Sequence, residues 1–260
     1  MQTVAALILL ITQVALGQDY KVAVKGNIFQ LDMAPNSVDD QYDGCREKMS
    51  NLVSTVFLEK ETSENYIFAA AWKEVKINVP GPEDNLTRNH LITIYMYTHN
   101  RVYNAFNDTV HKVLNNAVRN DKPKYINKTY TWYSLQFLLT EAIQILNETQ
   151  KTCQKTYRGT TNKYDVLNKD VRFGSFASSS LDQTEAEKFG NVSCFEIETC
   201  EGAELTKYSA FPYEKEVLIP PYEKFNLTDI KNGSWCDTVY VLKSSGTASN
   251  LNCAVASLAP

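Results

Sequence analysis

The sequence lacks the motifs that mark several common ligand sites. It has no CxxC pair, and its three histidines have no partner at the spacing of a metal site, so we expect no bound metal. It has no GxGxxG or Walker glycine-rich loop, which argues against a Rossmann or phosphate-loop nucleotide site. At a net charge of -4 it also lacks the basic field that binding to nucleic acid or to an anionic membrane surface requires.

Long apolar runs are also missing. The run over residues 4–16 is too short to span a membrane and ends at small residues before polar ones, which is the shape of a secretory signal peptide. We predict a signal peptide over residues 1–17 and a mature chain over residues 18–260. The last residues, "LNCAVASLAP", lack the roughly 10–20 residue apolar tail of a glycolipid-anchor signal. We therefore expect a secreted, extracellular protein with no membrane span.

The numbers of cysteines and glycosylation sequons agree with a secreted protein. An even number of cysteines in a secreted chain favours disulfides over metal binding. The six cysteines are Cys45, Cys153, Cys194, Cys200, Cys236 and Cys253. Sequons also arise by chance, so some are expected to be unused. The seven predicted glycosylation sites are Asn85, Asn107, Asn127, Asn147, Asn191, Asn226 and Asn232.

The mature chain is expected to form a single domain, because no linker, repeat or low-complexity segment divides it. The front part has the apolar periodicity of helices. One predicted stripe is Val102, Phe106, Val110, Val113 and Ala117, and another is Trp132, Leu135, Leu139, Ala142 and Leu146. From Cys153 onward, short β-prone runs alternate with Gly, Pro and Ser. We predict an α+β fold with an antiparallel or mixed sheet, a helical lobe over about 45–150 and a β-rich lobe over about 151–253.

Arginine and serine in two of these β-prone runs are candidate ligand-binding residues. In "TYRGT", Arg158 is followed by Gly159, and its planar charged fork suits a pyrophosphate; a surface or salt-bridge role is the alternative. In "FGSFASSSL", alternation along a strand would turn Ser178 and Ser180 to one face and Ser179 to the other. Hydroxyls there can orient a carboxylate or a ribose, although a serine-rich edge or turn fits equally well.

Two glutamates precede a short apolar run in "SAFPYEKEVLIPPYEKF". If they occupy an extended segment, Glu214 and Glu216 point to the same face, where neighbouring carboxylates repel and raise at least one pKa. A solvated acidic turn is the alternative. That is our interpretation of the same Glu-x-Glu pattern at Glu59/Glu61 and at Glu185/Glu187.

Taken in order, "YRG", "FASSSL" and "YSAFPYEKEVLIPPYEKF" resemble the Arg-Ser-Glu-x-Glu signature of the vertebrate ecto mono-ADP-ribosyltransferases that modify arginine. The resemblance extends to "LDMAPNSVDDQYDGC", to residues 97–100 and to "CEGAELTKYS", so it covers nearly the whole mature chain. It implies a compact NAD-binding transferase fold, in which a helical lobe packs on two β-sheets that form a cleft.

The resemblance also implies roles for individual residues. Arg158 and Gly159 would bind NAD, Ser178 and Ser180 would form the Ser-x-Ser element, and Glu216 would be the catalytic glutamate. Glu214 would be the upstream acid associated with arginine as acceptor. The loop that meets the target protein would contain Tyr208, Phe211 and Tyr213. NAD+, or alternatively NADP+, would be a co-substrate, and no metal or permanent cofactor is expected because nicotinamide leaves as a neutral group.

Similar proteins also suggest a disulfide pairing. They imply Cys45 with Cys253 and Cys153 with Cys200, which leaves Cys194 and Cys236 as an additional pair or as free thiols. The predicted function is transfer of ADP-ribose from NAD+ to arginines of extracellular or cell-surface proteins. The alternatives are an NAD+ glycohydrolase, in which water is the acceptor, and a catalytically silent secreted binding protein with the same fold.

Overall fold

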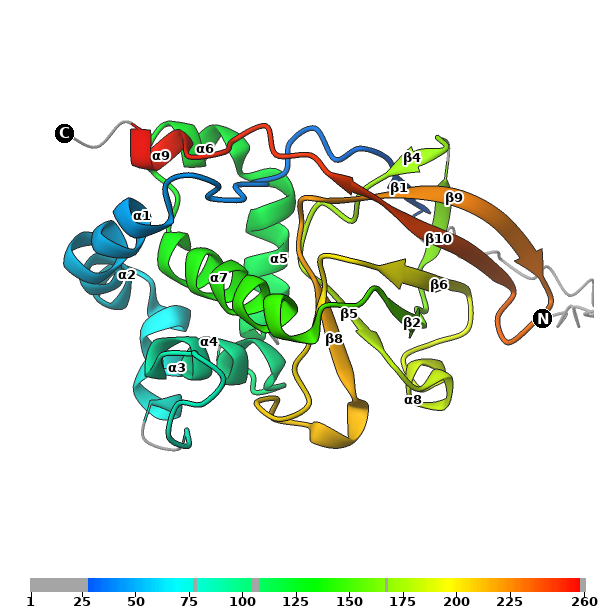
Figure 1. The fold of residues 1–260 in the computed structure, drawn as a ribbon, viewed down its shortest axis with the longest axis horizontal. Coiled ribbons are helices and arrows are strands. Elements are labelled where there is room, and N and C mark those ends of the chain that lie inside the picture. Colours follow the sequence, from blue (N-terminus) through cyan, green and yellow to red (C-terminus); the bar gives the residue numbers. More distant parts are fainter. Residues whose placement is uncertain (1–27, 77–78, 104–107, 167, 258–260) are drawn as a thin grey trace, which may run out of the picture.

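A computed structural model describes residues 28–76, 79–103, 108–166 and 168–257. The predicted signal peptide, together with Phe106 and Asn107, lies outside these residues. After one short strand, seven α-helices come first and nine strands follow in the described residues, so the predicted α+β class is confirmed. Figure 1 shows the helical lobe on one side of the molecule and the sheets on the other. Within the described ranges, no helix is long and apolar enough to cross a membrane.

The helical lobe occupies the region between the first and second strands. Its elements are α1 (Arg46–Leu52), the π-helical turn η1 (Val53–Phe57), α2 (Leu58–Glu64), α3 (Tyr66–Val75), α4 (Arg88–Thr98), α5 (Val110–Asn120), α6 (Lys122–Ile126) and α7 (Tyr133–Gln150). Two short helices follow within the β-rich region, α8 (Gln183–Glu187) and α9 (Ala254–Ser257). The last of these packs beside α1 and α6, so the end of the chain returns to the helical lobe (Figure 1).

One predicted helical stripe is confirmed and the other begins later than expected. All five residues of the second stripe are buried, with four of them in α7. In the first, α5 begins only at Val110, because Thr109 has extended dihedrals (φ -101°, ψ 160°) that exclude a helix entering from upstream. Val102 is therefore an exposed residue before the helix rather than part of its apolar face.

The strands form two sheets, as expected. They are β1 (Ile28–Leu31), β2 (Gln154–Arg158), β3 (Lys163–Val166), β4 (Asp170–Val171), β5 (Ala177–Ser180), β6 (Ser193–Thr199), β7 (Ala203–Glu204), β8 (Glu216–Ile219), β9 (Glu223–Asn232) and β10 (Thr238–Thr247). The larger sheet has the order β4-β9-β10-β6-β2-β5-β8-β7, and it is mixed because β10 runs parallel to β6. Strand β1, which no sequence pattern predicts, pairs parallel with β3 in a two-stranded sheet.

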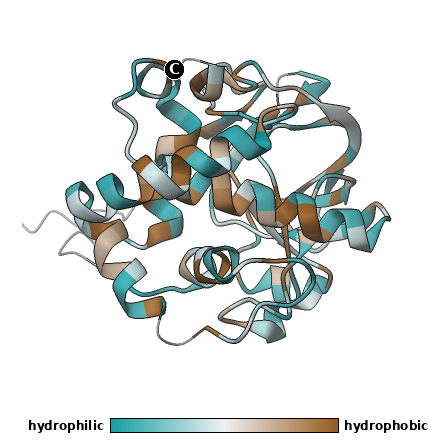
Figure 2. Ribbon diagram, turned by 60° about the vertical axis from the view of Figure 1, so that its left-hand side comes forward, coloured by the Kyte–Doolittle hydropathy of each residue, from teal (hydrophilic) through white to brown (hydrophobic). Residues whose placement is uncertain are grey.

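Strand β8 lies between the two main hydrophobic cores. Leu218 packs with the helical lobe, whereas its neighbour Ile219 packs with the core of the sheet. Figure 2 shows hydrophobic and hydrophilic residues interspersed along the helices. Because side chains alternate along a strand, Glu216 shares the face of Leu218. The fold therefore turns Glu216 toward the junction of the two lobes.

Glu61 was interpreted from the sequence as part of a solvated acidic segment, and this is wrong. Its carboxylate is buried and accepts hydrogen bonds from the backbone N–H groups of Tyr133 (2.5 Å) and Ser134 (2.9 Å). These two groups begin α7, whose N-cap residue Trp132 supplies no side-chain acceptor. Glu61 of α2 thus caps a neighbouring helix, a long-range contact that the local pattern does not reveal.

Two of the three disulfides are the pairs that the resemblance implies, and the third joins the two cysteines that it left over. Cys45 bonds to Cys253, Cys153 to Cys200, and Cys194 to Cys236. The first links the start of α1 to the segment before α9. The second links the start of the strand region to the turn between β6 and β7. Neither Cys194 nor Cys236 is a free thiol.

Candidate active site

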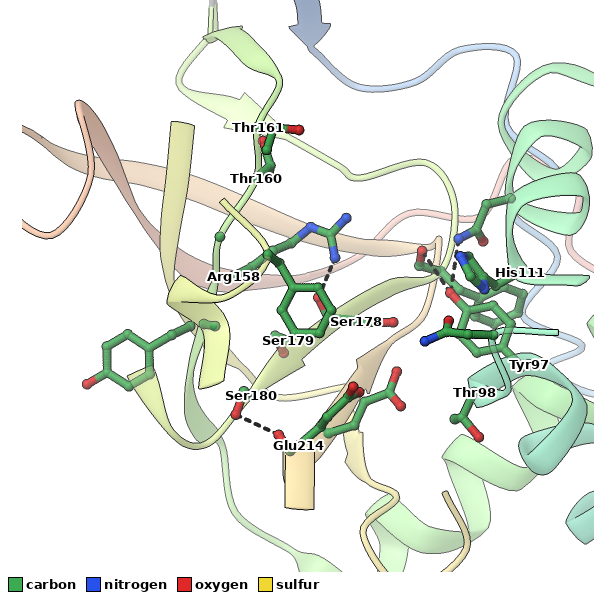
Figure 3. Close-up of a pocket in the computed structure, with 18 of the residues that line it drawn as sticks. Tyr97, Thr98, His111, Arg158, Thr160, Thr161, Ser178, Ser179, Ser180 and Glu214 are labelled. Carbon is green, nitrogen blue, oxygen red and sulfur yellow. Dashed lines mark hydrogen bonds between the residues drawn. The ribbon is translucent and has the colours of Figure 1, made fainter. Parts of the chain in front are cut away.

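A cavity of about 310 Å³ lies where the helical lobe meets the larger sheet. The helical lobe contributes Tyr97 and Thr98 from α4, Asn100 from the segment after it, and His111 and Asn115 from α5. The β-rich region contributes Arg158, Gly159, Ser178, Ser180, Glu214 and Glu216, among others. Six predicted site residues from three separate sequence segments therefore line one cavity. Figure 3 shows the labelled side chains around it.

The register of β5 against β8 brings Ser178 close to Glu216. Ser180 lies opposite Glu216, and Ser178 lies opposite Leu218, so Ser178 and Glu216 are diagonal neighbours on one face. The Ser178 hydroxyl donates a hydrogen bond to the Glu216 carboxylate. On the same strand, Ser179 points the other way and donates to the carbonyl of Val217 at 2.9 Å. The predicted alternation of the three serines agrees with this arrangement.

Arg158 ends β2 with its guanidinium in the cavity, where Nη1 donates to the carbonyl of Ser178 at 2.5 Å (Figure 3). The next residue, Gly159, is a glycine because the structure leaves no room for a side chain at this position. A Cβ at this position would lie 2.3 Å from the carbonyl oxygen of Ala186 and 2.5 Å from that of Gly190. The glycine lets the end of β2 pack against the segment that contains α8, and this contact fixes the backbone beside Arg158.

Glu214 reaches the cavity by a different route from the one predicted. It ends the 3-10 turn η2 (Pro212–Glu214) rather than lying in an extended segment, and Lys215 after it has a left-handed backbone (φ 47°). Only Glu216 belongs to the strand. Pro212 favours the turn because its fixed φ suits the first helical position. Ser180 completes this geometry, since its hydroxyl donates to the carbonyl of Glu214 at 2.7 Å (Figure 3).

The two glutamates differ in burial and charge environment. Burial raises the pKa of Glu216 to about 7; the Ser178 hydrogen bond lowers it, and the nearby Glu214 raises it. Glu214 is half-buried, and burial together with Glu185 raises its pKa as well. A carboxyl with a pKa near 7 can be ionised at neutral pH yet hold a proton in slightly acidic solution.

Tyr97 and Asn115 form a hydrogen-bonded group beside Ser178 and Glu216. Asn115 Nδ2 donates to the Tyr97 hydroxyl at 3.0 Å, and the Tyr97 hydroxyl donates to the backbone carbonyl of Phe176 at 3.4 Å. Because a hydroxyl donates only once, Tyr97 links α5 to the residue directly before β5, the strand that carries Ser178. In the sequence, Tyr97 belongs to residues 97–100, one of the segments that carry the family resemblance, but it has no predicted role. Its place beside Ser178 is not visible in the sequence, because α4 and β5 become neighbours only in the folded chain.

His111 was also missed as a cavity residue. Burial lowers its pKa to about 4, with further lowering from the charges of Lys112 and Arg158. It is therefore neutral at pH 7, with a ring nitrogen 3.1 Å from the hydroxyl oxygen of Thr109. In the part of the chain that the structure describes, no group of three or more His, Cys, Asp or Glu side chains could hold a metal.

The remaining predicted residues lie away from the cavity. Tyr208, Phe211 and Tyr213 do not line it; Tyr208 is buried, and Tyr213 is exposed on the loop before Glu214. Asn107 lies outside the described residues. Four of the sequon asparagines are exposed and Asn226 is half-buried; the exposed ones are Asn85, Asn127, Asn191 and Asn232.

Asn147 has an environment that does not suit glycosylation. Its Nδ2, the atom to which a glycan is attached, donates to the carbonyls of Cys200 (2.9 Å) and Gly202 (2.8 Å). A glycan would remove these hydrogen bonds between α7 and the β6–β7 turn. We expect this sequon to be unused in the folded protein.

An arginine, a serine-bearing strand and two glutamates around one interlobe cavity are the features expected of a mono-ADP-ribosyltransferase. The comparisons with known proteins agree. The model of the NAD:arginine ADP-ribosyltransferase family matches residues 31–249, and the chain belongs to this family.

Two curated relatives show how far the similarity extends. The chain is 33% identical over 243 residues to GPI-linked NAD(P)(+)--arginine ADP-ribosyltransferase 1 of Mus musculus, with 86% of this chain and 72% of the relative covered. It is 31% identical over 239 residues to ecto-ADP-ribosyltransferase 5 of Bos taurus, covering 86% and 73%.

Solved structures have the same fold. The crystal structure of the eucaryotic mono-ADP-ribosyltransferase ART2.2 superposes with a TM-score of 0.73 at 29% identity, covering 86% of this chain and 98% of that one. A mutant of ART2.2 in complex with NAD gives a TM-score of 0.71 at 28% identity, with the same coverage. The predicted transferase fold is therefore confirmed.

Proposed function

We propose that this protein transfers ADP-ribose from NAD+ to arginine side chains of proteins and releases nicotinamide, using Arg158, Ser178, Glu216 and Glu214. Membership of the NAD:arginine ADP-ribosyltransferase family supports this activity. One observation carries the residue roles: all four side chains line a single cavity, with Glu216 buried at the lobe junction and Glu214 half-buried on the turn beside it.

On the donor side, Arg158 offers a permanently charged planar fork that suits the pyrophosphate of NAD+. Cleavage breaks the bond between the nicotinamide nitrogen and ribose C1, and the bonding pair leaves with nicotinamide, which departs as a neutral molecule. Positive charge then develops on the ribose, as in glycoside hydrolysis. Ionised Glu216, oriented by Ser178, holds a ribose hydroxyl and stabilises this charge.

On the acceptor side, the arginine guanidinium is protonated at neutral pH and is a poor nucleophile. Glu214 accepts a proton from it while a guanidinium nitrogen forms the new bond to ribose C1. The proton then passes to solvent, so atoms and charge balance. Burial raises the pKa of Glu214, and a carboxylate with a raised pKa is a stronger base than a fully exposed one.

Hydrolysis of NAD+ is the alternative outcome at the same centre. Water would attack ribose C1 and would require Glu216 but not Glu214. A catalytically silent binding protein is the weaker alternative, because the cavity keeps the complete set of Arg158, Ser178, Glu214 and Glu216.

The place of action and the partners are part of the proposal. Three disulfides and relatives named ecto-enzymes support action outside the cell, on arginine-bearing extracellular or cell-surface proteins. Relatives named NAD(P)+ transferases support a test of NADP+ as a second ADP-ribose donor.

Secretion without a glycolipid anchor stays a prediction. Treatment of expressing cells with a phospholipase that cleaves such anchors should leave the amount of this protein in the culture medium unchanged.

The test incubates the purified protein with labelled NAD+ and agmatine, a small guanidinium acceptor. We expect ADP-ribosyl-agmatine as the main product. Free ADP-ribose alone would identify a glycohydrolase, and the absence of both products would favour the silent binding protein.

A further inference from the structure

The loop before Glu214 is fastened to the helical lobe at three points. Asp84 accepts hydrogen bonds from the Tyr208 hydroxyl and from Lys207 Nζ, the latter at 3.1 Å. The backbone N–H of Ala210 donates to Thr98 Oγ1 at 2.9 Å. The third contact is a ring stack between His99 and Phe211, with centroids 6.3 Å apart and planes 22° apart. We call residues 207–213 the bridge loop.

The other end of the bridge loop is fastened to the β-rich region. Lys215 Nζ forms an ion pair with Asp182 at 3.0 Å, and the carbonyl of Lys215 accepts from the N–H of Leu181. The carbonyl of Glu214 accepts from Ser180, as described above. Glu214 is therefore carried by a segment stretched between the two lobes, with its backbone position set from both sides.

Thr98 is suited to hold this loop. It is buried at the end of α4, and its hydroxyl donates to the carbonyl of Ile94 at 3.0 Å. This bond orients the oxygen lone pairs toward the N–H of Ala210. Thr98 also lines the cavity, so the last turn of α4 forms a wall of the donor site and anchors the bridge loop.

We propose that Thr98, His99 and Asp84 are positioning residues that hold Glu214 in place for the guanidinium acceptor and thereby set the ratio of transfer to hydrolysis. The inference rests on the proposed function. A general base must lie within hydrogen-bond reach of the proton it takes, and a displacement of about 1 Å can cost about 10²-fold in rate. Water is small and abundant, and its attack does not need Glu214. Loosening the bridge loop therefore reduces transfer much more than hydrolysis.

The experiment compares Thr98→Val with Thr93→Val. Both replace a buried threonine of α4 by a residue of the same shape, but the Thr93 hydroxyl has no hydrogen-bond partner among the described residues. With NAD+ and agmatine, we expect Thr98→Val to lower the ratio of ADP-ribosyl-agmatine to free ADP-ribose by about tenfold. Thr93→Val should leave this ratio unchanged.

Asp84→Ala provides a second test, because Asp84 is exposed and does not line the cavity. Asp84→Ala should lower the ratio of ADP-ribosyl-agmatine to free ADP-ribose and leave the KM for NAD+ unchanged. If Thr98→Val does not fold, Asp84→Ala alone tests the positioning role. His99→Ala should act similarly, and His99→Phe should restore the ratio by keeping the stack.

The inference is overturned if both products fall in parallel in Thr98→Val and Asp84→Ala, or if neither ratio changes. If the wild-type protein makes no ADP-ribosyl-agmatine, the proposed function fails and this inference fails with it. These outcomes are distinguishable, because the wild-type reaction tests the function and the variants test the positioning.

Discussion

Two buried glutamates, one in each lobe, have similar burial and a similar pKa but different surroundings. Glu61 is 3% exposed and Glu216 is 5% exposed, and burial raises the pKa of each to about 7. The Glu61 carboxylate accepts two backbone hydrogen bonds at the start of α7. The Glu216 carboxylate accepts from the Ser178 hydroxyl and faces a cavity large enough for part of a ligand.

The difference teaches that a raised pKa does not by itself identify a catalytic group. Backbone donors occupy the Glu61 oxygens, and this carboxylate therefore has a structural role as a helix cap. Glu216 has a side-chain donor on one side and open volume on the other, so it can contact a substrate. The following predictions test this distinction, beginning with the largest effect.

Replacing Glu216 by Gln should abolish most activity. The variant keeps the shape of the side chain but cannot become negatively charged opposite the ribose. We expect both transfer and hydrolysis to fall by about 10³-fold or more, measured as the two labelled products. Glu61→Gln is the matched control and should retain activity within about twofold of wild type. Similar losses in the two variants would contradict the distinction.

The pH dependence of activity should follow Glu216 and not Glu61. Because Glu216 acts in its ionised form and has a pKa of about 7, kcat/KM for NAD+ should reach a plateau above pH 7. Below it, the value should fall by about tenfold per pH unit. The same profile in Glu61→Gln would support the assignment, whereas loss of this acidic limb in Glu61→Gln would refute it.

Tyr97→Phe should have a moderate effect. It removes the hydroxyl that links Asn115 to the carbonyl of Phe176, which loosens the strand that carries Ser178 without removing a group that contacts the reacting atoms. We expect transfer and hydrolysis to fall together by about 3- to 10-fold, near the value of one lost hydrogen bond. Asn116→Ala, an exposed neighbour on α5, should have no effect. A selective loss of transfer would place Tyr97 on the acceptor side instead.

Glu61→Gln should change stability rather than activity. Gln has one acceptor oxygen for two N–H groups, so we expect a loss of about 1–3 kcal/mol in the free energy of unfolding. The pKa of Glu61 is higher in the folded state than in the unfolded chain, so its contribution to stability is complete below pH 4.5 and is lost as pH rises through about 7. Chemical unfolding of wild type between pH 5 and 8 should show this decline, and the variant should show a weaker one. An equal decline in both would argue against the raised pKa.

The sequence predicted the order of helices and strands, and local patterns were sufficient for this. The apolar stripe of α7 and the β-prone runs after Cys153 depend mainly on neighbours in the chain. The resemblance indicated the cavity residues Arg158, Ser178 and Glu216, whose ordered motifs are specific in combination although each is weak alone.

Contacts between distant segments could not be predicted in the same way. Strand β1 pairs with β3 across more than 130 residues of sequence, and Glu61 caps a helix that begins 72 residues later. For Glu214 the sequence left an extended segment and an acidic turn open, and Pro212 and Lys215 form a turn that brings it to the cavity. Such positions depend on the packing of the lobes, which a local pattern does not contain.

The most direct test of the account is the product ratio of Glu214→Gln with NAD+ and agmatine. If Glu216 serves the donor sugar and Glu214 the acceptor, total cleavage of NAD+ should stay near the wild-type rate. The ratio of ADP-ribosyl-agmatine to free ADP-ribose should fall by about 10²-fold. If both products fall in parallel, the two glutamates act as one unit and the division of tasks between them is wrong.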